Sequence, residues 1–457
     1  MSAFSLDAIT NELLVLIADY LDHDALARLN RTCKRINAVI EPQIWTKIEF
    51  HSNGYHESSA EAKDPPPFTA ATLRNYQTER HPGQYALGHI HENKAMTFVN
   101  LLQDYHANNQ ERLKELCSRV KHLCTGVIHE WGQREGYGDD EGDNKTKFWQ
   151  IIPYFTNLET LEIHGDNTAL PLIIDEITAP PLQKLRFTKL FAYVPLQFAQ
   201  WVMKSAPTLE RLDLGLLDRP ISTSLANNPE NPPLPEENLG DSDGESDYGS
   251  LCGENVIPRP MGGIVCGRLE PNLSRLKTLY LCSPAASPVS EDAWSQYTFS
   301  SRAERACFSD WRRLLLASSR TLETLVLDQR PGAEYIENDG VTEAEYMRLN
   351  EDGNINKALV KLVKDLLVDK DTFPLLKHVY LYGFAVAENS ERQPGEKTPG
   401  GRLMLDLAQR GVKCEARLGK WCFFDSDPGY TFWCKWEDDD DDEEDEEDSW
   451  DTLLAQV

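Results

Sequence analysis

The stretch Ile9–Trp45 near the N-terminus, ITNELLVLIADYLDHDALARLNRTCKRINAVIEPQIW, contains two runs of apolar residues at helical spacing. The first run comprises Leu13, Leu14, Ile17, Tyr20 and Leu21. The second follows a capping Asp24 and comprises Leu26, Leu29, Cys33, Ile36 and Ile40, after which Pro42 is expected to end the helix. So few residues cannot bury both stripes. We therefore expect apolar surface left over for a partner or for the domain that follows.

These residues resemble the F-box, whose pattern runs Leu-Pro-x-Glu-Ile/Leu, Leu-x-x-Ile, Tyr-Leu, an acidic residue before a Leu, a Cys-Lys/Arg pair and a terminal Trp. The matching residues are Ile9-Thr10-Asn11-Glu12-Leu13, Leu14, Ile17, Tyr20-Leu21, Asp24, Leu26, Cys33-Lys34-Arg35 and Trp45. Thr10 replaces the usual Pro, and both suit a helix start. The resemblance implies a three-helix module that binds the adaptor Skp1 through Ile9, Leu13, Leu14, Ile17, Leu21, Leu26 and Trp45. The alternative is an ordinary helical start to a larger core.

The composition indicates an acidic protein of two or more domains. The chain has 457 residues, 40% of them hydrophobic, and a formal net charge of −28. The unbroken acidic run Glu437–Asp448 supplies −12 of this charge, so the remainder is acidic too. Neutralising phosphates requires a concentrated basic face, which the sequence lacks, so direct nucleic-acid binding is not expected.

Ten scattered cysteines without a CxxC pair indicate reduced thiols in the cytoplasm, the nucleus or both. The sequence shows neither a secretion signal nor an apolar stretch long enough to span a bilayer, so we expect a soluble protein without membrane contact. No phosphate-binding loop, nucleophile elbow or metal-ligand spacing stands out. The sequence therefore predicts no catalytic residue, no metal and no cofactor.

A Leu-x-x-Leu-x-Leu phrase recurs through the rest of the chain. Its apolar positions are Leu158-Leu161-Ile163, Leu182-Leu185-Phe187, Leu209-Leu212-Leu214, Leu276-Leu279-Leu281, Leu322-Leu325-Leu327 and Leu376-Val379-Leu381, with a weaker copy at Val120-Leu123. The alternation within the phrase predicts a short strand. Helical patterns precede several copies, at Leu196–Lys204, Ala303–Ser318 and Lys357–Val368. Helix followed by strand resembles leucine-rich repeats, which implies an α/β solenoid of short parallel strands alternating with helices.

We divide the chain into an F-box at 1–50, a connector and helical region at 51–117, an irregular repeat solenoid at 118–436 and an acidic tail at 437–457. A helical pair is expected at Lys94–Val120, and a last helix at Arg402–Gln409 with a degenerate strand at Val412–Leu418. The polar segment 218–272 is predicted to be a disordered insertion. The aromatic stretch Trp421–Trp436 predicts a hairpin that caps the solenoid.

Residues that flank the buried positions of each predicted strand are expected on the inner curve of the solenoid. They are Thr160, Glu162, His164, Lys184, Arg186, Arg211, Asp213, Thr278, Tyr280, Thr324, Val326, Asp328, His378, Tyr380 and Tyr382. Tyrosine provides contact area at low entropic cost. A protein substrate is thus expected to anchor at Tyr280, Tyr380 and Tyr382, with Arg186 and Arg211 on the same face. The alternative is that these positions are merely solvated.

The two resemblances imply a non-catalytic substrate receptor of an SCF (Skp1–cullin–F-box) ubiquitin ligase, of the irregular kind that fungi carry in large numbers. The chain would bind Skp1 and, through it, a cullin, while the repeats hold a protein substrate. A second hypothesis keeps Skp1 but omits the cullin. A third draws on the likeness of the repeats and acidic tail to acidic leucine-rich nuclear proteins, which bind basic partners such as histones.

Overall fold

The computed structural model describes residues 9–18, 20–21, 23–50, 92–127, 133–134, 148–166, 172–173, 177–191, 196–215, 256–257, 272–285, 298–299, 301–333, 354–386, 395–417 and 422–423. The helices are α1 (Asn11–Ala18), α2 (His23–Asn30), α3 (Lys34–Ile44), α7 (Glu92–Asn108), α8 (Gln110–Arg119), α9 (Phe148–Ile151), α10 (Leu196–Met203), α13 (Ser301–Ser318), α15 (Lys357–Leu367) and α16 (Pro399–Arg410), with 3₁₀ turns η3 (Ile152–Tyr154), η4 (Ala206–Thr208) and η7 (Asn354–Asn356). The strands are β1 (Lys47–Glu49), β2 (His122–Val127), β3 (Gln133–Arg134), β4 (Thr160–Asp166), β5 (Leu172–Ile173), β6 (Phe187–Phe191), β7 (Arg211–Gly215), β8 (Val256–Ile257), β9 (Thr278–Ala285), β10 (Thr298–Phe299), β11 (Thr324–Ala333), β12 (His378–Tyr382), β13 (Lys413–Arg417) and β14 (Cys422–Phe423).

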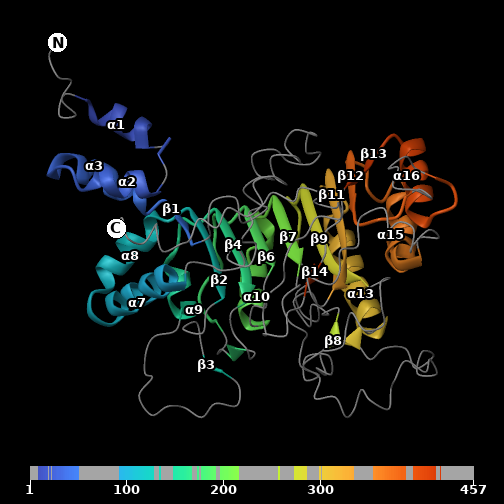
Figure 1. Cartoon of the computed structure of the whole chain (residues 1–457), viewed down its shortest axis with the longest axis horizontal. Coiled ribbons are helices and arrows are strands. Elements are labelled where there is room, and N and C mark those ends of the chain that lie inside the picture. Colours follow the sequence, from blue (N-terminus) through green and yellow to red (C-terminus); the bar gives the residue numbers. More distant parts are fainter. Residues whose placement is uncertain are drawn as a thin grey trace, which may run out of the picture.

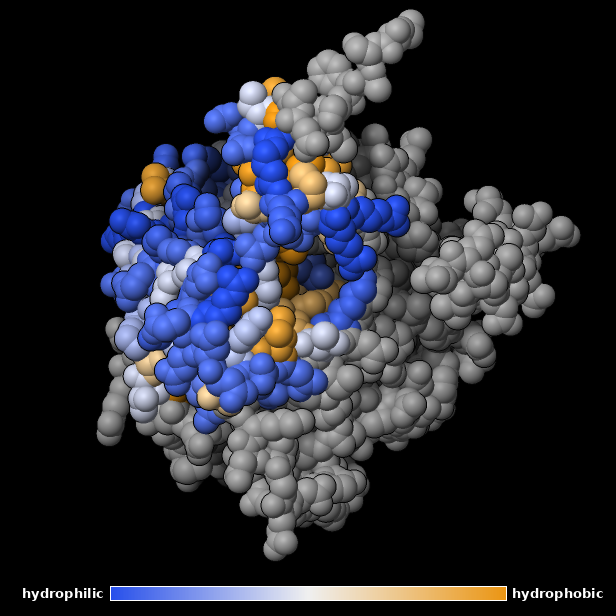
Figure 2. Space-filling model, turned by 90° about the vertical axis from the view of Figure 1, so that its left-hand side faces the viewer, coloured by the Kyte–Doolittle hydropathy of each residue, from blue (hydrophilic) through white to orange (hydrophobic). Residues whose placement is uncertain are grey.

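Helices α1 to α3 form an N-terminal helical unit with a small core of its own, which Figure 1 shows at the left end of the molecule. The core consists of Leu14, Ala18, Leu26, Ile36 and Ile40. The second predicted stripe spans two helices rather than one, because Cys33 adopts an extended backbone between α2 and α3. The prediction that Pro42 ends the helix is wrong, since α3 continues to Ile44 with this proline in its last turn. Figure 2 views this end of the molecule and shows apolar residues among the polar ones.

Ten strands form one sheet, in the order β1-β2-β4-β6-β7-β9-β11-β12-β13, with β14 paired to β11. Neighbouring strands are parallel throughout, for example β7 beside β9 and β9 beside β11. Figure 1 shows helices α7 to α16 along one side of this sheet. Two small pairs, β3 with β5 and β8 with β10, lie outside it. The predicted alternation of helices with short parallel strands is confirmed for these elements.

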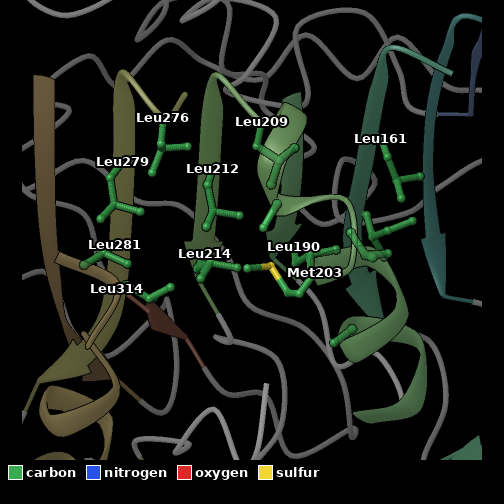
Figure 3. Close-up of a cluster of buried hydrophobic side chains, with 14 of the residues drawn as sticks. Leu161, Leu190, Met203, Leu209, Leu212, Leu214, Leu276, Leu279, Leu281 and Leu314 are labelled. Carbon is green, nitrogen blue, oxygen red and sulfur yellow. The ribbon is translucent and has the colours of Figure 1, made fainter. Parts of the chain in front are cut away.

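Two rows of mainly apolar side chains run from strand to strand on the face that the helices cover. The first row is Ile48, Leu123, Leu161, Thr188, Leu212, Leu279, Leu325, Val379 and Cys414, and the second is Thr125, Ile163, Leu190, Leu214, Leu281, Leu327, Leu381 and Ala416. Met203 of α10 and Leu314 of α13 pack against these rows (Figure 3). Burying one leucine contributes roughly 1.5–3 kcal/mol, so the two rows account for much of the stability of the sheet.

The register of β6 differs from the prediction. Phe187 pairs with Thr160 and Thr188 with Leu161, so the core positions here are Leu185, Thr188 and Leu190 instead of Leu182, Leu185 and Phe187. Thr188 occupies the middle apolar position of the Leu-x-x-Leu-x-Leu phrase in β6. The triplet Leu182-Leu185-Phe187, which is apolar throughout, therefore matched the phrase better. As a result Phe187 and Lys189, and not Lys184 and Arg186, point to the opposite face of the sheet.

The N-terminal ends of the strands carry charges whose sign alternates from one strand to the next. The residues that precede the strands in register are Lys121, Glu159, Arg186, Glu210, Lys277, Glu323 and Lys377, each joined to the next by a backbone hydrogen bond. Ion pairs link Lys121 with Glu159, Arg186 with Glu210 and Glu323 with Lys377. We call this set the charge ladder. Its alternation favours the observed strand neighbours, since like charges in adjacent strands repel.

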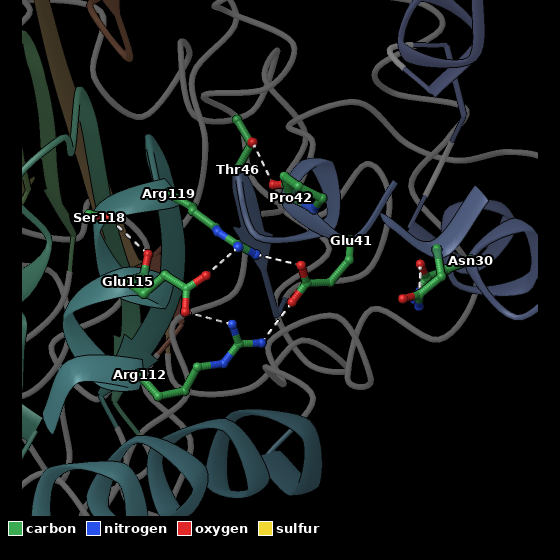
Figure 4. Close-up of polar contacts among 9 residues, drawn as sticks. Asn30, Glu41, Pro42, Thr46, Arg112, Glu115, Ser118 and Arg119 are labelled. Atoms are coloured by element: carbon green, nitrogen blue, oxygen red, sulfur yellow. Dashed lines mark hydrogen bonds and ion pairs between the residues drawn. The ribbon is translucent and has the colours of Figure 1, made fainter. Parts of the chain in front are cut away.

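A four-residue ion network joins the N-terminal helical unit to helix α8, which packs in the core of the sheet (Figure 4). Glu41 of α3 binds Arg112 at 2.8 Å and Arg119 at 2.6 Å, both from α8, and both arginines also bind Glu115. Partial burial disfavours the charged form of Glu41, but the hydrogen bonds from Arg119 and Arg112 outweigh this effect and lower its pKa. We call this network the Glu41 clasp.

The chain also passes without a linker from α3 into the sheet, because β1 pairs with β2. The ring of Phe98 in α7 lies 6.1 Å from that of Trp45 and 5.2 Å from that of Phe50. Phe50 belongs to the core of the sheet, against which Trp45 packs. The packing therefore crosses the boundary that the sequence suggested at residue 50, and α7 and α8 share the same core.

Several predicted segments fall partly or wholly outside the described residues. The segment 218–272 contains β8, and the rest of it up to 271 lies outside, as does the acidic tail at 437–457. Of the predicted hairpin at Trp421–Trp436 only β14 is described, and it pairs with β11 rather than with the last strand β13. Within the described part, none of the helices combines the length and apolarity needed to cross a membrane.

The charge ladder predicts a specific sensitivity to charge reversal. Glu323→Lys would place three positive charges side by side with Lys277 and Lys377, and we expect the free energy of unfolding to fall by about 1 kcal/mol. Adding Lys377→Glu restores one of the two lost pairs and should recover about half of that loss. Urea titration at low and high salt measures both effects. A loss that does not shrink at high salt would rule out the electrostatic explanation.

The Glu41 clasp predicts a pH-dependent contribution to stability. Because the pKa of Glu41 is lowered in the folded protein, its contribution is present above the unfolded pKa and is lost as the pH falls through the folded pKa. We expect Glu41→Gln to lower the free energy of unfolding at neutral pH by roughly 1 kcal/mol, and the difference to shrink below about pH 4. Glu111→Gln is the matched control, since Glu111 is exposed and binds Lys114 within α8. An equal loss in both variants would contradict the clasp.

Candidate functional site

Helix α1 presents a stripe of exposed apolar side chains. Leu13, Leu16, Ile17 and Tyr20 are 51%, 54%, 39% and 90% exposed. Their spacing of three and four residues places Leu13, Leu16 and Ile17 on one side of the helix, and Tyr20 continues this side beyond its end. We call these four residues the α1 stripe. Contiguous exposed apolar surface of this kind marks a site of interaction with another molecule.

The seven residues predicted to bind an adaptor have different roles in the structure. Leu14 and Leu26 are buried in the core of the N-terminal helical unit, and Ile9 and Leu21 pack against that core. Trp45 packs against the core of the sheet. These five positions hold the structure together, and the burial of Leu14 and Leu26 leaves these two side chains little surface for direct contact with an adaptor. Only Leu13 and Ile17 of the predicted set belong to the α1 stripe.

Leu16 and Tyr20 are not among the docking residues predicted from the sequence, although both are more exposed than Ile17. Helical spacing contained the signal, because positions three and seven residues after Leu13 lie on the same side as Leu13 itself. The pattern could not tell which side of α1 faces the small core. That choice depends on the contacts that α1 makes with α3.

Polar contacts at the start of α1 fix its orientation. Arg35 of α3 donates from Nη1 to Asn11 Oδ1 at 2.8 Å and from Nη2 to the Ile9 carbonyl at 2.9 Å. The Leu13 amide lies 3.4 Å from Thr10 Oγ1, a long contact for the predicted capping hydroxyl. Hydrogen bonds from its own backbone amide and from Thr10 lower the pKa of Glu12. These contacts hold α1 against α3 with the α1 stripe outward.

The face of the sheet opposite the helices carries two rows of polar and aromatic side chains. The first is partly exposed and consists of His122, Thr160, Phe187, Arg211, Thr278, Thr324 and His378. We call it the open row. The second is buried and consists of Cys124, Glu162, Lys189, Asp213, Tyr280, Val326 and Tyr380. Lys189 thus lies in register between two carboxylates, which offsets the cost of burying its charge.

The three tyrosines predicted to anchor a substrate are buried. Tyr280, Tyr380 and Tyr382 are 1%, 0% and 2% exposed, and Tyr280 donates a 2.6 Å hydrogen bond to Asp328. The strand periodicity placed them correctly on the face opposite the helices. It could not predict their accessibility, which depends on neighbouring structure. The expectation that they form an exposed anchor is therefore wrong.

The two predicted arginines differ as well. Arg186 has a side chain that is 61% exposed, but it belongs to the charge ladder and pairs with Glu210. Arg211 is part of the open row; its guanidinium binds Asp213 at 2.7 Å and lies 4.9 Å from the centre of the Phe187 ring. Its side chain is only 17% exposed. A partner could therefore reach Arg186 freely and Arg211 at its edge.

Comparison with known proteins identifies the N-terminal helical unit. The protein-family model described as F-box-like matches residues 11–51, which contain α1 to α3, β1 and Phe50. No match was found among curated proteins. F-box domains are typically adaptor modules and generally bind Skp1-like adaptors. The N-terminal unit of this chain is an F-box-like domain, and its presence supports the classification of the chain as an F-box protein.

Proposed function

We propose that this protein is a non-catalytic adaptor that docks a Skp1-like protein through the α1 stripe and holds a protein partner on its parallel sheet. Through the Skp1-like protein it would join a cullin and act as the substrate receptor of an SCF ubiquitin ligase. The observation that carries the proposal is the exposed α1 stripe on an F-box-like domain.

The energetics of the α1 stripe support docking. Full burial of a leucine or isoleucine side chain contributes roughly 1.5–3 kcal/mol, and the members of the stripe start from 39% to 90% exposed. Burying all four on one partner supplies several kcal/mol towards the cost of association. Leu14 and Leu26 contribute indirectly, because they hold α1 in place.

The sheet supports the second half of the proposal. Its strands carry the Leu-x-x-Leu-x-Leu phrase in register on the helix-covered face, as expected of a leucine-rich-repeat solenoid. In this proposal the open row and the exposed Arg186 form the contact surface for the substrate. The open row offers aromatic, hydroxyl and imidazole groups in a line across seven strands, which suits an extended segment of a protein.

The junction between domain and sheet supports a positioning role. The Glu41 clasp and β1 hold the F-box-like domain against the sheet without a linker. A bound substrate would then stay at a fixed place relative to the docked adaptor. Such an arrangement raises the effective concentration of substrate lysines near a ubiquitin-loaded enzyme that other subunits recruit.

Adaptor docking is tested with charged substitutions in the α1 stripe. We expect Leu13→Asp with Ile17→Asp to weaken binding of purified Skp1-like adaptor by at least about thirtyfold, because two charges would be buried at the contact. Leu316→Asp is the matched control, since Leu316 of α13 is 44% exposed and far from α1 in sequence. Biolayer interferometry measures the affinities. Point variants are preferable to deleting residues 1–50, which would also remove β1 and Phe50 from the sheet.

If the stripe variant binds the adaptor as tightly as the unmodified chain, the proposed docking is wrong. If the adaptor binds but no cullin co-precipitates with it, the protein is a Skp1-binding adaptor outside the ubiquitin ligases.

Substrate binding is tested by proximity labelling with three versions of the chain: unmodified, Leu13→Asp with Ile17→Asp, and Thr278→Arg with Thr324→Arg. We expect the α1 variant to lose the adaptor and cullin but to retain substrates. The open-row variant should show the opposite pattern, because two arginines would obstruct the centre of the row. Labelling that is identical in the unmodified and open-row chains would place the substrate elsewhere.

A further inference from the structure

The charges of this protein are divided unevenly along the chain. Residues within the described ranges include 34 Lys and Arg against 23 Asp and Glu, a net charge of +11. All other residues together include 12 Lys and Arg against 51 Asp and Glu, a net charge of −39. The helices and strands are therefore a cationic body, although the whole chain carries −28. Acidic segments of the same chain are its nearest counter-charges.

Some of these cations lie in the same F-box-like domain as the α1 stripe. Arg28, Arg31 and Lys34 are exposed, and none of them has an ion-pair partner among the described residues. Lys34 is the first residue of α3 and adjoins Arg35, which binds Ile9 and Asn11 at the start of α1. The F-box-like domain thus combines exposed apolar side chains with unpaired positive charges.

The C-terminal segment 437–457 has the complementary composition. Twelve consecutive acids at Glu437–Asp448 are followed by Ser449–Val457, SWDTLLAQV. Within it Trp450, Leu453, Leu454 and Val457 are spaced so that they would share one face of a helix. Ser449 suits the N-cap position and Asp451 the first turn of such a helix. The other acidic stretches, such as Asp241–Asp247, lack apolar residues at this spacing.

The chain is long enough to bring this segment to the F-box-like domain. The last described residue is Phe423 in β14, which pairs with β11, and β11 is six strand positions from β1. Six spacings of ~4.8 Å amount to roughly 29 Å. The 26 residues between Phe423 and Trp450 span up to about 86 Å when extended.

We propose that segment 437–457 docks on the F-box-like domain of its own chain, with its apolar residues on the α1 stripe and its acids near Arg28, Arg31 and Lys34. The docked segment covers the surface that the proposed adaptor requires, so adaptor and segment compete. The competition rests on the proposed function, whereas the docking itself does not. Removing the negative charges or raising the salt concentration opens the surface.

A weak interaction is sufficient because the segment is tethered. At an effective concentration of about 1 mM, a docking Kd of roughly 0.2 mM gives five docked molecules for each open one. The affinity for a competing adaptor then falls about sixfold.

The test compares the full-length chain with a full-length variant that carries Trp450→Ser, Leu453→Ser and Leu454→Ser. Hydroxyl-radical footprinting reports the accessibility of Tyr20 and Leu16, with Leu316 as the internal control. We expect faster modification of Tyr20 and Leu16 in the variant and unchanged modification of Leu316. Equal modification of Tyr20 in both proteins would overturn the docking. Protection that disappears on dilution would assign the contact to a second copy and would overturn the intramolecular form.

The competition is measured as the affinity of each full-length protein for a purified Skp1-like adaptor. We expect the serine variant to bind about sixfold more tightly at low salt, with a smaller difference at about 0.5 M NaCl. Equal affinities alongside a positive footprint would overturn the competition. If neither protein binds the adaptor, the proposed function fails, and the footprint alone still decides the docking.

Discussion

Each unit of one strand and its helix has an apolar side that can leave water only against the neighbouring units. The two rows of mainly apolar side chains are the result, because each of the sheet strands β2, β4, β6, β7, β9, β11 and β12 contributes side chains to a core that no single unit could form alone. Stability is thus shared between neighbours, and the ends of the stack are its weakest positions. At the first end the solution is β1, a three-residue strand supplied by the chain that leaves the F-box-like domain.

That solution has a mechanical result. A strand shared between two units leaves no flexible connector, and the Glu41 clasp adds a second attachment on the side of α8. The F-box-like domain is therefore oriented by the same contacts that finish the sheet. Damage to the first strand pair would disturb both the stack and the direction in which α1 points, so the stability of the sheet and the presentation of the α1 stripe are coupled at this junction.

Much of the architecture could be predicted from the sequence, because the leucine phrase combines strand periodicity with a regular core position. The helices α7, α8, α10, α13, α15 and α16 followed from their own apolar spacing. The register of β6 could not be predicted, since Thr188 conceals the middle position, nor could β1, whose three residues contain no phrase. Both are fixed by neighbouring strands rather than by local sequence.

The candidate site was predictable in kind but not in detail. The pattern at Glu12, Tyr20 and Cys33 identified an F-box-like segment, yet it did not separate buried from exposed positions within α1. Likewise, alternation placed Tyr280 and Tyr380 on the correct face without showing that they are covered. Periodicity determines direction, whereas accessibility depends on the whole fold.

The charge ladder limits how such a stack can change its length. Loss or duplication of one unit would bring two charges of the same sign into adjacent strands, whereas a change of two neighbouring units preserves the alternation. For the charge ladder the repeating unit is therefore a pair of strands, although for the core it is a single strand. The charges would thus favour the gain or loss of two units at a time in a stack whose core permits the gain or loss of single units.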